Sequence, residues 1–484
     1  MKTDSVVTPP TQMPSDALIV KLPAANLRPT YTMPRGADRK TAAWNLLVAN
    51  AAKTQAPLVA LAEQLKASGA IAGYELLVAP NALVVDPASG KGRDVLDAFG
   101  TAAGVVSVYD QEGRQLYKAG HATLADAAQG AALAKRAPYG LDLFQRGDLV
   151  SKEQLAADER PWGLDMVGAA AANAAGADGT GLVFGSIDTG ADVTHEAIAA
   201  KYRGRQADGS TLDDYSWFDF NPTKSPTPKD YDAHGTHTIG TVLGSTDAQQ
   251  IGVAPNAKWI SVHGLTGNLD VRLKALQFML APTMRDGSAP RPELAPDVVG
   301  MSWWTGSAAS DVFADSMASL VAAGIEPVKS AGNKGPTPES ITSPGQYPTV
   351  TAVAAVGPDG QIAEFSSRGP SPLPHPASSP GWKPDFSAPG VDVVSSVPGN
   401  RYQKMSGTSM AQPHMSGAML AILSKFPTLT HDQLRTVLKE SAVDAGARGQ
   451  DLEFGYGIIN LPKALEIAAT LVAPKPVTAS AIAH

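Results

Sequence analysis

The chain has 484 residues, enough for two or three domains, and its 43% hydrophobic and 18% charged residues are an ordinary globular composition. A formal net charge of −7 and the lack of any run of Lys and Arg give no electrostatic basis for binding nucleic acid. The absence of cysteine excludes a thiol nucleophile, a disulfide framework and thiolate metal sites. No stretch of 18 apolar residues occurs, so we expect no membrane-spanning helix.

The first part of the chain is predicted to hold a small α+β domain. Residues 1–15 are expected to be a disordered lead without a typical signal peptide, because Asp4 and Asp16 interrupt any apolar core. Residues 16–110 follow the order β-α-β-β-α-β, which is typical of a ferredoxin-like domain. Strands are expected at 16–22, 71–80, 82–86 and 104–110, and helices at 39–68 and 92–100.

The remainder of the chain is predicted to be a linker, a larger α/β domain and a tail. Residues 111–158 are rich in Ala and in charged residues without a core pattern, so we expect a linker with some helix. From residue 159 to 468, apolar strands alternate with helical segments, which predicts a parallel sheet with helices on both faces. Residues 469–484 are expected to be a flexible tail.

Asp188 ends the apolar strand 181–188, and a Thr-Gly turn follows it. In open α/β sheets, functional sites form at the carboxyl ends of the strands, so Asp188 is a candidate catalytic residue. An Asp at this place can also simply cap a turn.

Two histidines occur in the segment 232–244, DAHGTHTIGTVLG, whose small residues let a helix pack close to a sheet. His234 and His237 could serve in catalysis, in the core or as metal ligands on one helix face. The Glu of an H-E-x-x-H site is missing, and no second His follows the pair His195–Glu196 at the required spacing. These observations disfavour a zinc site.

Ser409 lies where a Gly-Thr turn meets the helical segment 406–423, SGTSMAQPHMSGAMLAIL. The amides and the dipole of a helix N-terminus would favour negative charge developing at its Oγ. Pro413 removes an amide that would otherwise bond back toward Ser409, and broken local rules of this kind tend to mark functional sites. A capping serine is the alternative interpretation.

The order Asp188, His234, Ser409 is that of the subtilisin triad. An α/β-hydrolase would need an acid and then a His after the nucleophile. The later histidines fit that plan poorly: His414, His431 and His484.

Four motifs, in order, resemble those of the subtilase family. They are SIDTG (186–190), HGTHTIGT (234–241), SAGNKG (330–335) and GTSMAQPH (407–414). Flanking segments such as KYRG, YSWFD, FSSRGP and GYGIINLPKAL look most like the bacillopeptidase F branch. The resemblance covers about residues 160–468, and residues 16–110 are more weakly similar to the family's inhibitor-type propeptide.

The resemblance implies a subtilisin-like catalytic domain over 159–468 and a role for each motif residue. Ser409 would be the nucleophile, His234 the general base, and Asp188 the acid that orients the imidazole. Asn333 would donate to the oxyanion together with the Ser409 amide. The implied function is a secreted or envelope-associated serine endopeptidase made as a self-processing zymogen, with 111–158 as the processing region. A cytoplasmic location, a catalytically silent binding module and a generic esterase are the alternatives.

The sequence departs from the family at the strand that pairs with substrate. Ser302, Trp303, Trp304 and Thr305 stand where the family usually has Ser-Leu-Gly-Gly or Ser-Trp-Gly-Gly. Large side chains there are expected to narrow the P1 pocket if Trp304 points inward. An outward Trp304 would instead enlarge an apolar surface for P2 or P4, since strand alternation lets only one of the two tryptophans face P1. The expected partners are protein or peptide substrates and the chain's own propeptide, and we expect a monomer. The chemistry needs no cofactor. Calcium is a common structural ion in the family, but no EF-hand-like loop is seen.

Overall fold

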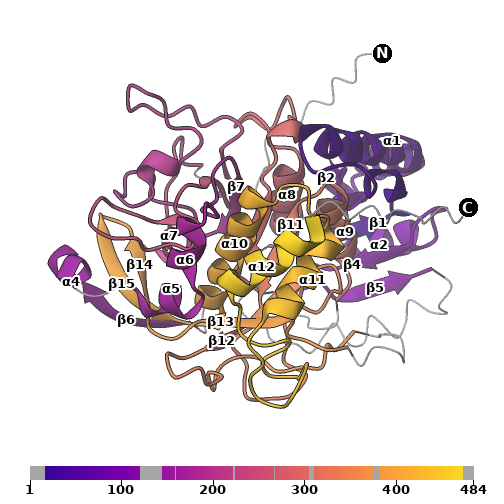
Figure 1. Ribbon diagram of the computed structural model, residues 1–484. Helices are drawn as coiled ribbons and strands as arrows, with labels where there is room; N and C mark the ends of the chain where they lie inside the picture. Colours follow the sequence, from indigo (N-terminus) through magenta and orange to yellow (C-terminus); the bar gives the residue numbers. More distant parts are fainter. Residues whose placement is uncertain are drawn as a thin grey trace, which may run out of the picture.

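The computed structural model describes residues 17–119, 144–157, 160–221, 224–265, 268–304, 310–373 and 381–472. The predicted lead, 1–15, lies outside the described residues, as do residues 473–484 of the predicted tail. Figure 1 shows residues 17–119 beside a larger unit that contains the other described residues.

A seven-stranded sheet in the order β13-β12-β11-β10-β7-β9-β8 is the centre of the larger unit, and every neighbouring pair is parallel. Its strands are β7 (Val183–Asp188), β8 (Trp217–Asp219), β9 (Lys258–His263), β10 (Val298–Met301), β11 (Glu326–Ser330), β12 (Thr351–Val356) and β13 (Phe386–Pro389). Its central strands are buried on both faces, as their continuous apolar sequences require.

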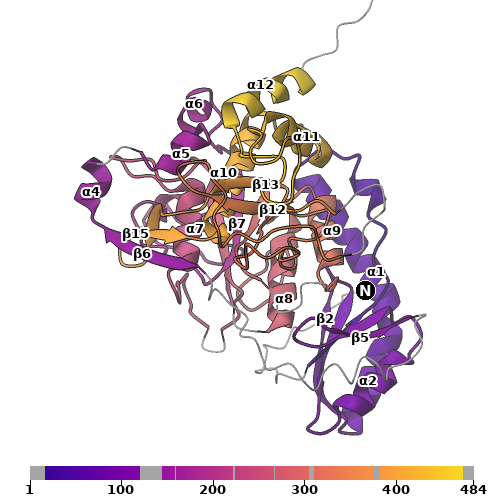
Figure 2. The same ribbon diagram turned by 90° about the horizontal axis from the view of Figure 1, so that it is seen from below.

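Helices cover both faces of this sheet, which confirms the predicted fold class. On one face, α7 (His234–Leu243) and α10 (Thr408–Lys425) pack directly on the strands. Outside them lie α5 (Trp162–Met166), α6 (Ala169–Ala174), α11 (His431–Ser441) and α12 (Leu461–Val472) (Figure 1). On the other face lie α8 (Leu269–Leu280) and α9 (Ala314–Ala322) (Figure 2). Helix α12 includes the first four residues of the predicted tail, 469–472.

The N-terminal unit is an antiparallel sheet in the order β2-β3-β1-β4-β5 with two helices. Its elements are β1 (Leu18–Lys21), α1 (Ala37–Ala67), β2 (Ile71–Leu77), β3 (Ala82–Pro87), α2 (Gly92–Gly100), β4 (Ser107–Tyr109) and β5 (Gln115–Lys118). The predicted β-α-β-β-α-β order is present. Strand β5 extends the sheet past residue 110, into the region predicted to be linker.

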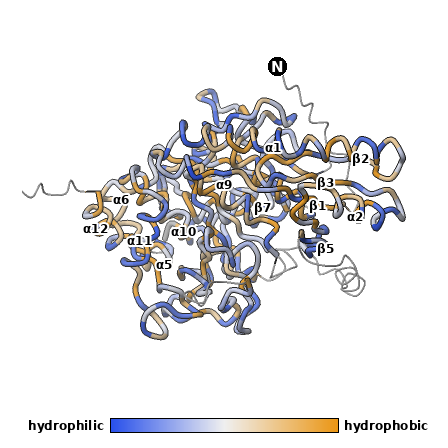
Figure 3. The backbone as a smooth tube through the Cα atoms, turned by 90° about the vertical axis from the view of Figure 1, so that its right-hand side faces the viewer, coloured by the Kyte–Doolittle hydropathy of each residue, from blue (hydrophilic) through white to orange (hydrophobic). Residues whose placement is uncertain are grey.

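The two units share a hydrophobic core. Strand residues alternate between the faces of the N-terminal sheet, so Ile19 and Val84 face the larger unit while Leu18 and Val20 face a separate core within the N-terminal unit. The shared cluster includes apolar residues of α8 and α9, which lie between the two sheets (Figure 2). In Figure 3 the N-terminal unit lies at one end of the molecule, α11 and α12 lie at the other, and β7 lies between them.

Side chains of the N-terminal unit also cap both of these helices. The Oε1 atom of Gln111 accepts hydrogen bonds from the amides of Leu269 and Asp270 in the first turn of α8, at 3.0 and 3.2 Å. The buried guanidinium of Arg39 donates to the carbonyls of Val321 and Ala322 at the end of α9. Helix ends carry backbone groups without intrahelical partners, so these contacts satisfy groups that the interface removes from water.

The region predicted as a linker also contains a strand that belongs to the larger unit. Strand β6 (Gln145–Val150) pairs antiparallel with β15 (Arg401–Ser406), which pairs in turn with β14 (Val393–Val397). The short helix α4 (Lys152–Ala157) follows. Most residues of β6 are exposed, so the strand has no apolar pattern that sequence analysis could detect.

Two histidines are buried within α7 and α10. The Nε2 atom of His237 lies 3.0 and 3.1 Å from the carbonyl oxygens of Val393 and Gln403, and burial lowers its pKa to about 3. The Nδ1 atom of His414 lies 2.8 Å from the carbonyl of Met410, and burial lowers its pKa to about 4. Both imidazoles therefore stay neutral in the folded protein at neutral pH.

Acid is expected to destabilise the fold from about pH 6.5 downward. In the unfolded chain both histidines become protonated below the ordinary His pKa of 6.5. In the folded protein His237 and His414 stay neutral until the pH approaches their lowered pKa values of about 3 and about 4. The free energy of unfolding should fall by up to about 1.4 kcal/mol per pH unit for each imidazole. Denaturant unfolding of Ser409→Ala between pH 7 and 4 measures this slope. Adding His237→Gln, which keeps a donor but does not titrate, should make the slope shallower, and equal slopes would contradict the assignment.

Candidate active site

The predicted site residues meet at the carboxyl edge of the parallel sheet. Asp188 ends β7, Ser302 follows β10 and Asn333 follows β11, and these three strands are neighbours in the sheet. The N-termini of α7 and α10, which carry His234 and Ser409, pack against the same strands. Residues far apart in the sequence are thus brought together by the topology.

Asp188 and His234 form a buried hydrogen-bonded pair. The Nδ1 atom of His234 lies 2.7 Å from Oδ1 of Asp188, and the two side chains are 0% and 2% exposed. The Thr189 amide also donates to Oδ1 of Asp188, at 2.7 Å. With the Nδ1 proton directed at the carboxylate, Nε2 is left as an acceptor, and it has no partner among the described residues. An imidazole held in this way is ready to take a proton.

Asp230, which the sequence analysis missed, fixes the loop before α7. Its carboxylate accepts hydrogen bonds from the amides of Ala233 and Thr236, at 2.9 and 2.8 Å, and from the hydroxyl of Thr189 at 2.7 Å. The Thr189 hydroxyl accepts in turn from the amide of Gly235, at 2.9 Å. An Asp shortly before a helix is a capping signal that could have identified this residue.

Gly235 is required by the close approach of this loop to the end of β7. A Cβ atom at Gly235 would lie 2.0 Å from the carbonyl oxygen of Gly190, which is backbone and cannot move aside. The glycine of the H-G-T-H motif therefore lets the start of α7 approach β7 closely enough for the imidazole of His234 to contact Asp188.

Ser409 lies in the first turn of α10, and Ser302 compensates for the break at Pro413. Pro413 has no amide to donate to the Ser409 carbonyl, which accepts instead from the Ser302 hydroxyl at 3.1 Å. The Ser302 hydroxyl also lies 2.9 Å from Oε1 of Gln412, and the Ser302 carbonyl accepts from the Ser409 hydroxyl at 3.4 Å. Ser302, predicted to bind substrate, therefore holds Ser409 through its side chain.

Asn333 is oriented by the start of α10. Its Oδ1 atom accepts from the amide and the hydroxyl of Thr408, both at 2.8 Å, which directs the Nδ2 group elsewhere. A Cβ atom built on Gly407 would lie 3.4 Å from this Nδ2 and 3.6 Å from the Ser409 amide nitrogen. The two donors thus flank one point beside Gly407. The amide of Ser409 belongs to a helix turn whose N–H groups have no intrahelical partner.

The two tryptophans of the predicted substrate strand lie in different surroundings. Trp303 is 2% exposed and packs in the core near Phe313 and the guanidinium of Arg272. Trp304 is partly exposed, and the ammonium of Lys334 lies 4.1 Å from the centre of one of its rings. Thr305 lies outside the described residues. Only Trp304 is therefore placed to border a bound chain, and its effect on P1 specificity stays a prediction.

The histidines weighed as metal ligands have other contacts. Nε2 of His195 lies 2.9 Å from the carbonyl of Arg401, and His237 bonds to two carbonyls as described above. No group of three or more His, Cys, Asp or Glu side chains that could hold a metal occurs in the described part of the chain. Structural calcium stays a prediction. Across the same residues, no helix is long and apolar enough to cross a membrane.

Comparison with known proteins gives consistent matches. Bacillopeptidase F of Bacillus subtilis (strain 168) is 38% identical over 325 residues, 63% of this chain and 22% of that protein. Subtilisin E of the same strain is 31% identical over 315 residues, 63% of this chain and 71% of that protein. A thermostable alkaline protease of Halalkalibacterium halodurans is 30% identical over 312 residues, 63% of this chain and 73% of that protein.

The matched part of the chain thus spans about a fifth of bacillopeptidase F and most of the shorter relatives. Residues 179–457, more than half of the chain, match the subtilase family, and they include Asp188, His234, Asn333 and Ser409. The chain belongs to the subtilase family.

Proposed function

We propose that this chain is a serine endopeptidase that hydrolyses peptide bonds of proteins through an acyl-enzyme, with Asp188, His234 and Ser409 as its triad. The observation that carries the proposal is the buried pair of Asp188 and His234 at the sheet edge where α10 presents Ser409. The Nε2 atom of this His234 has no partner among the described residues. A serine hydroxyl is a weak nucleophile until a base takes its proton, and this imidazole is poised to do so.

In the proposed reaction, Ser409 Oγ attacks the substrate carbonyl carbon while its proton passes to Nε2 of His234. Asp188 stabilises the resulting imidazolium through Nδ1. The negative charge on the carbonyl oxygen is met by Nδ2 of Asn333 and the amide of Ser409, and the N-terminus of α10 adds its dipole. His234 then gives its proton to the leaving amine, and water releases the acyl group by the reverse sequence.

We further propose that the chain is a zymogen, with the N-terminal unit as an intramolecular inhibitor. The shared hydrophobic core and the capping of α8 and α9 support this role. An inhibitory domain must stay bound, which requires an interface with buried apolar surface and satisfied polar groups. On the basis of the family resemblance, we also propose that the protein is secreted or envelope-associated, is a monomer, and needs no cofactor for catalysis.

The test of the function is covalent labelling of Ser409. A fluorophosphonate should label the wild type at Ser409 and abolish hydrolysis of casein, because only an activated serine reacts. Ser409→Ala should neither take the label nor cleave casein. A folded wild type that stays unlabelled would instead support a silent binding module. Labelling with turnover of a simple ester but not of casein would support an esterase.

Asn333→Ala is expected to lower kcat by about 10²–10³, the loss known for removing such an amide donor in a subtilisin, with little change in KM. Asn333→Asp separates two explanations, because it keeps the acceptor for Thr408 but loses the donor. Both variants should be impaired if Nδ2 stabilises the oxyanion. A normal kcat in Asn333→Asp together with a low kcat in Asn333→Ala would contradict the oxyanion role and would show that Asn333 acts only by accepting hydrogen bonds from α10.

Ser302→Ala is expected to lower the free energy of unfolding by about 1–3 kcal/mol, because the buried carbonyl of Ser409 loses its donor. As a positioning residue, Ser302 should affect kcat more than KM. Ser316→Ala is the matched control, since the Ser316 hydroxyl in α9 is buried without a partner among the described residues. Equal losses of stability in the two variants, measured by denaturant unfolding, would contradict the role of Ser302.

A further inference from the structure

Trp304 lies on the Ser409 side of the segment that continues β10. The hydroxyl of Ser302, two residues earlier, donates to the Ser409 carbonyl. Trp303 points the other way and packs near Phe313 in the core. Because side chains of an extended segment alternate between two sides, Trp304 falls on the same side as Ser302. The partly exposed ring of Trp304 therefore borders the place where a substrate would meet Ser409.

The exposed side chain of Lys334 lies over this ring. Lys334 directly follows Asn333, and its Nζ atom lies 4.1 Å from the centre of one Trp304 ring. An ammonium over an aromatic face is attracted by the ring, but its other N–H donors still point toward solvent or an anion. Partial burial lowers the pKa of Lys334, and no carboxylate among the described residues offsets that effect. The site thus carries a positive charge without an anionic partner in the described part of the chain.

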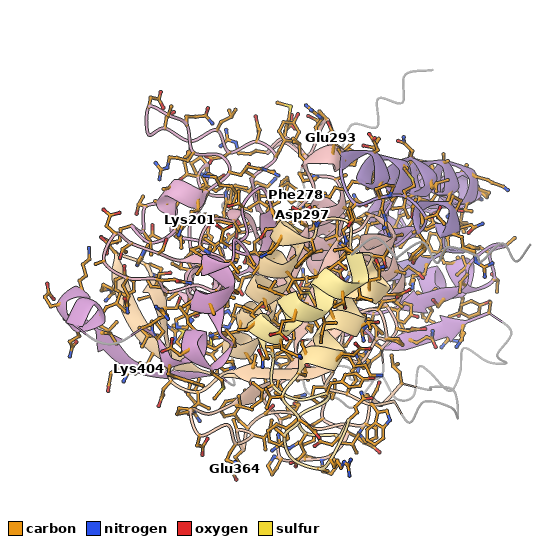
Figure 4. All side chains as sticks on the ribbon, in the orientation of Figure 1. Lys201, Phe278, Glu293, Asp297, Glu364 and Lys404 are labelled. Carbon is orange, nitrogen blue, oxygen red and sulfur yellow. The ribbon has the colours of Figure 1, made fainter. Side chains whose placement is uncertain are left out.

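The loop that carries Lys334 is held in place by the segment that follows β12. The Lys334 amide donates to the Ser367 hydroxyl at 3.1 Å. A Cβ atom on Gly335 would lie 2.5 Å from the carbonyl oxygen of Glu364, which is labelled at the lower edge of Figure 4. The backbone of Lys334 is therefore fixed beside Asn333, which is itself bonded to the start of α10.

From this arrangement we propose that the site selects substrates with an acidic side chain at P1, the residue that contributes the scissile carbonyl, and that Lys334 is the residue that selects it. The inference rests on the proposed endopeptidase function. The substrate oxygen is expected between Nδ2 of Asn333 and the amide of Ser409, and the P1 Cα atom is bonded to the same carbonyl carbon. The P1 side chain therefore starts beside Asn333, within reach of the next residue, Lys334.

The indole ring of Trp304 strengthens the attraction between Lys334 and a carboxylate. A bound P1 carboxylate would replace water at the ammonium while the ring stays against its other side. With water excluded from one side of the pair, the local dielectric constant falls and the Coulombic energy rises. A neutral amide of the same shape as glutamate lacks this energy, and a cationic P1 side chain is repelled by Lys334.

The experiment compares peptides that are identical except for Glu, Gln, Lys or Phe at P1, cleaved by the purified enzyme at neutral pH and low ionic strength. Wild type should cleave the Glu peptide with a kcat/KM at least about 10-fold above that of the Gln peptide, the effect of one hydrogen bond between charged groups. Lys334→Gln should bring the two values together. Added salt should shrink the wild-type preference, because it screens a partly exposed ion pair.

Two further variants test whether the charge of Lys334 is the cause. Lys334→Glu should reverse the order, so that the Lys peptide is cleaved faster than the Glu peptide. Lys439→Gln is the matched control, because Lys439 is also exposed and its ammonium lies 4.7 Å from the ring centre of Tyr456, but it belongs to the outer helix α11. This control should keep the wild-type preference. Circular dichroism checks the fold of each variant.

The outcomes separate the P1 preference from the enzymatic function. A wild type that labels at Ser409 and digests casein, but cleaves the Glu and Gln peptides equally, would overturn the preference and leave the proposed function standing. A preference for Glu that survives in Lys334→Gln would overturn the role of Lys334. A wild type that neither labels nor cleaves any peptide would remove the proposed function, and the P1 preference with it. If Lys334→Glu fails to fold, the ratios in wild type and Lys334→Gln still decide.

Discussion

The burial of helix α10 is the constraint on which the rest of the site depends. Residues 408–423 are all buried, because the helix lies between the parallel sheet and the outer helices. A helix in that position can neither slide nor tilt without disturbing the whole core. Its first turn, with Ser409, is thereby fixed against the sheet edge, where Asp188, Ser302 and Asn333 lie at the ends of three neighbouring strands.

A buried helix start also leaves polar groups that need partners, and the site is made of these partners. Asn333 accepts a hydrogen bond from the first amide of α10. Ser302 donates to the carbonyl of Ser409, which receives no intrahelical bond because Pro413 has no amide hydrogen. Each contact satisfies a buried backbone group and also orients a side chain beside Ser409. Stability and the geometry of the site are therefore supplied by the same hydrogen bonds.

The sequence could predict much of this because the information is local. Strand–helix alternation indicated the parallel sheet, and the residues around Asp188, His234 and Ser409 carry strong local signals of strand ends and helix starts. Strand β6 could not be predicted, because its six residues are mostly exposed and pair with β15 some 250 positions away. Phe144 immediately precedes β6, and its edge contact with the imidazole of His234, with 4.8 Å between the ring centres, depends on that pairing. The exchange of hydrogen bonds between Ser302 and Ser409 likewise depends on the register of strands and helix in three dimensions.

The charges at the interface between the two units bear on whether the N-terminal unit can leave. Burial alone would raise the pKa of Glu326, but Arg35 of the N-terminal unit and His431 of the larger unit together lower it to about 2. If the N-terminal unit leaves, Arg35 goes with it, whereas His431 remains 2.7 Å from Glu326.

The same arrangement recurs at other charges of this interface. Lys274 would lose Glu75 but keep Asp270, 3.0 Å away in the same helix. Asp297 would lose Lys40 but keep the amide of Val183 at 2.9 Å. Removing one partner of a buried ion pair lowers stability by about 3–5 kcal/mol when the other charge is left buried without a partner. Here each of these charges in the larger unit has a second partner within its own unit, so separation leaves none of the three alone. Departure of the N-terminal unit, as proposed above, would therefore leave these three charges with a partner in the larger unit.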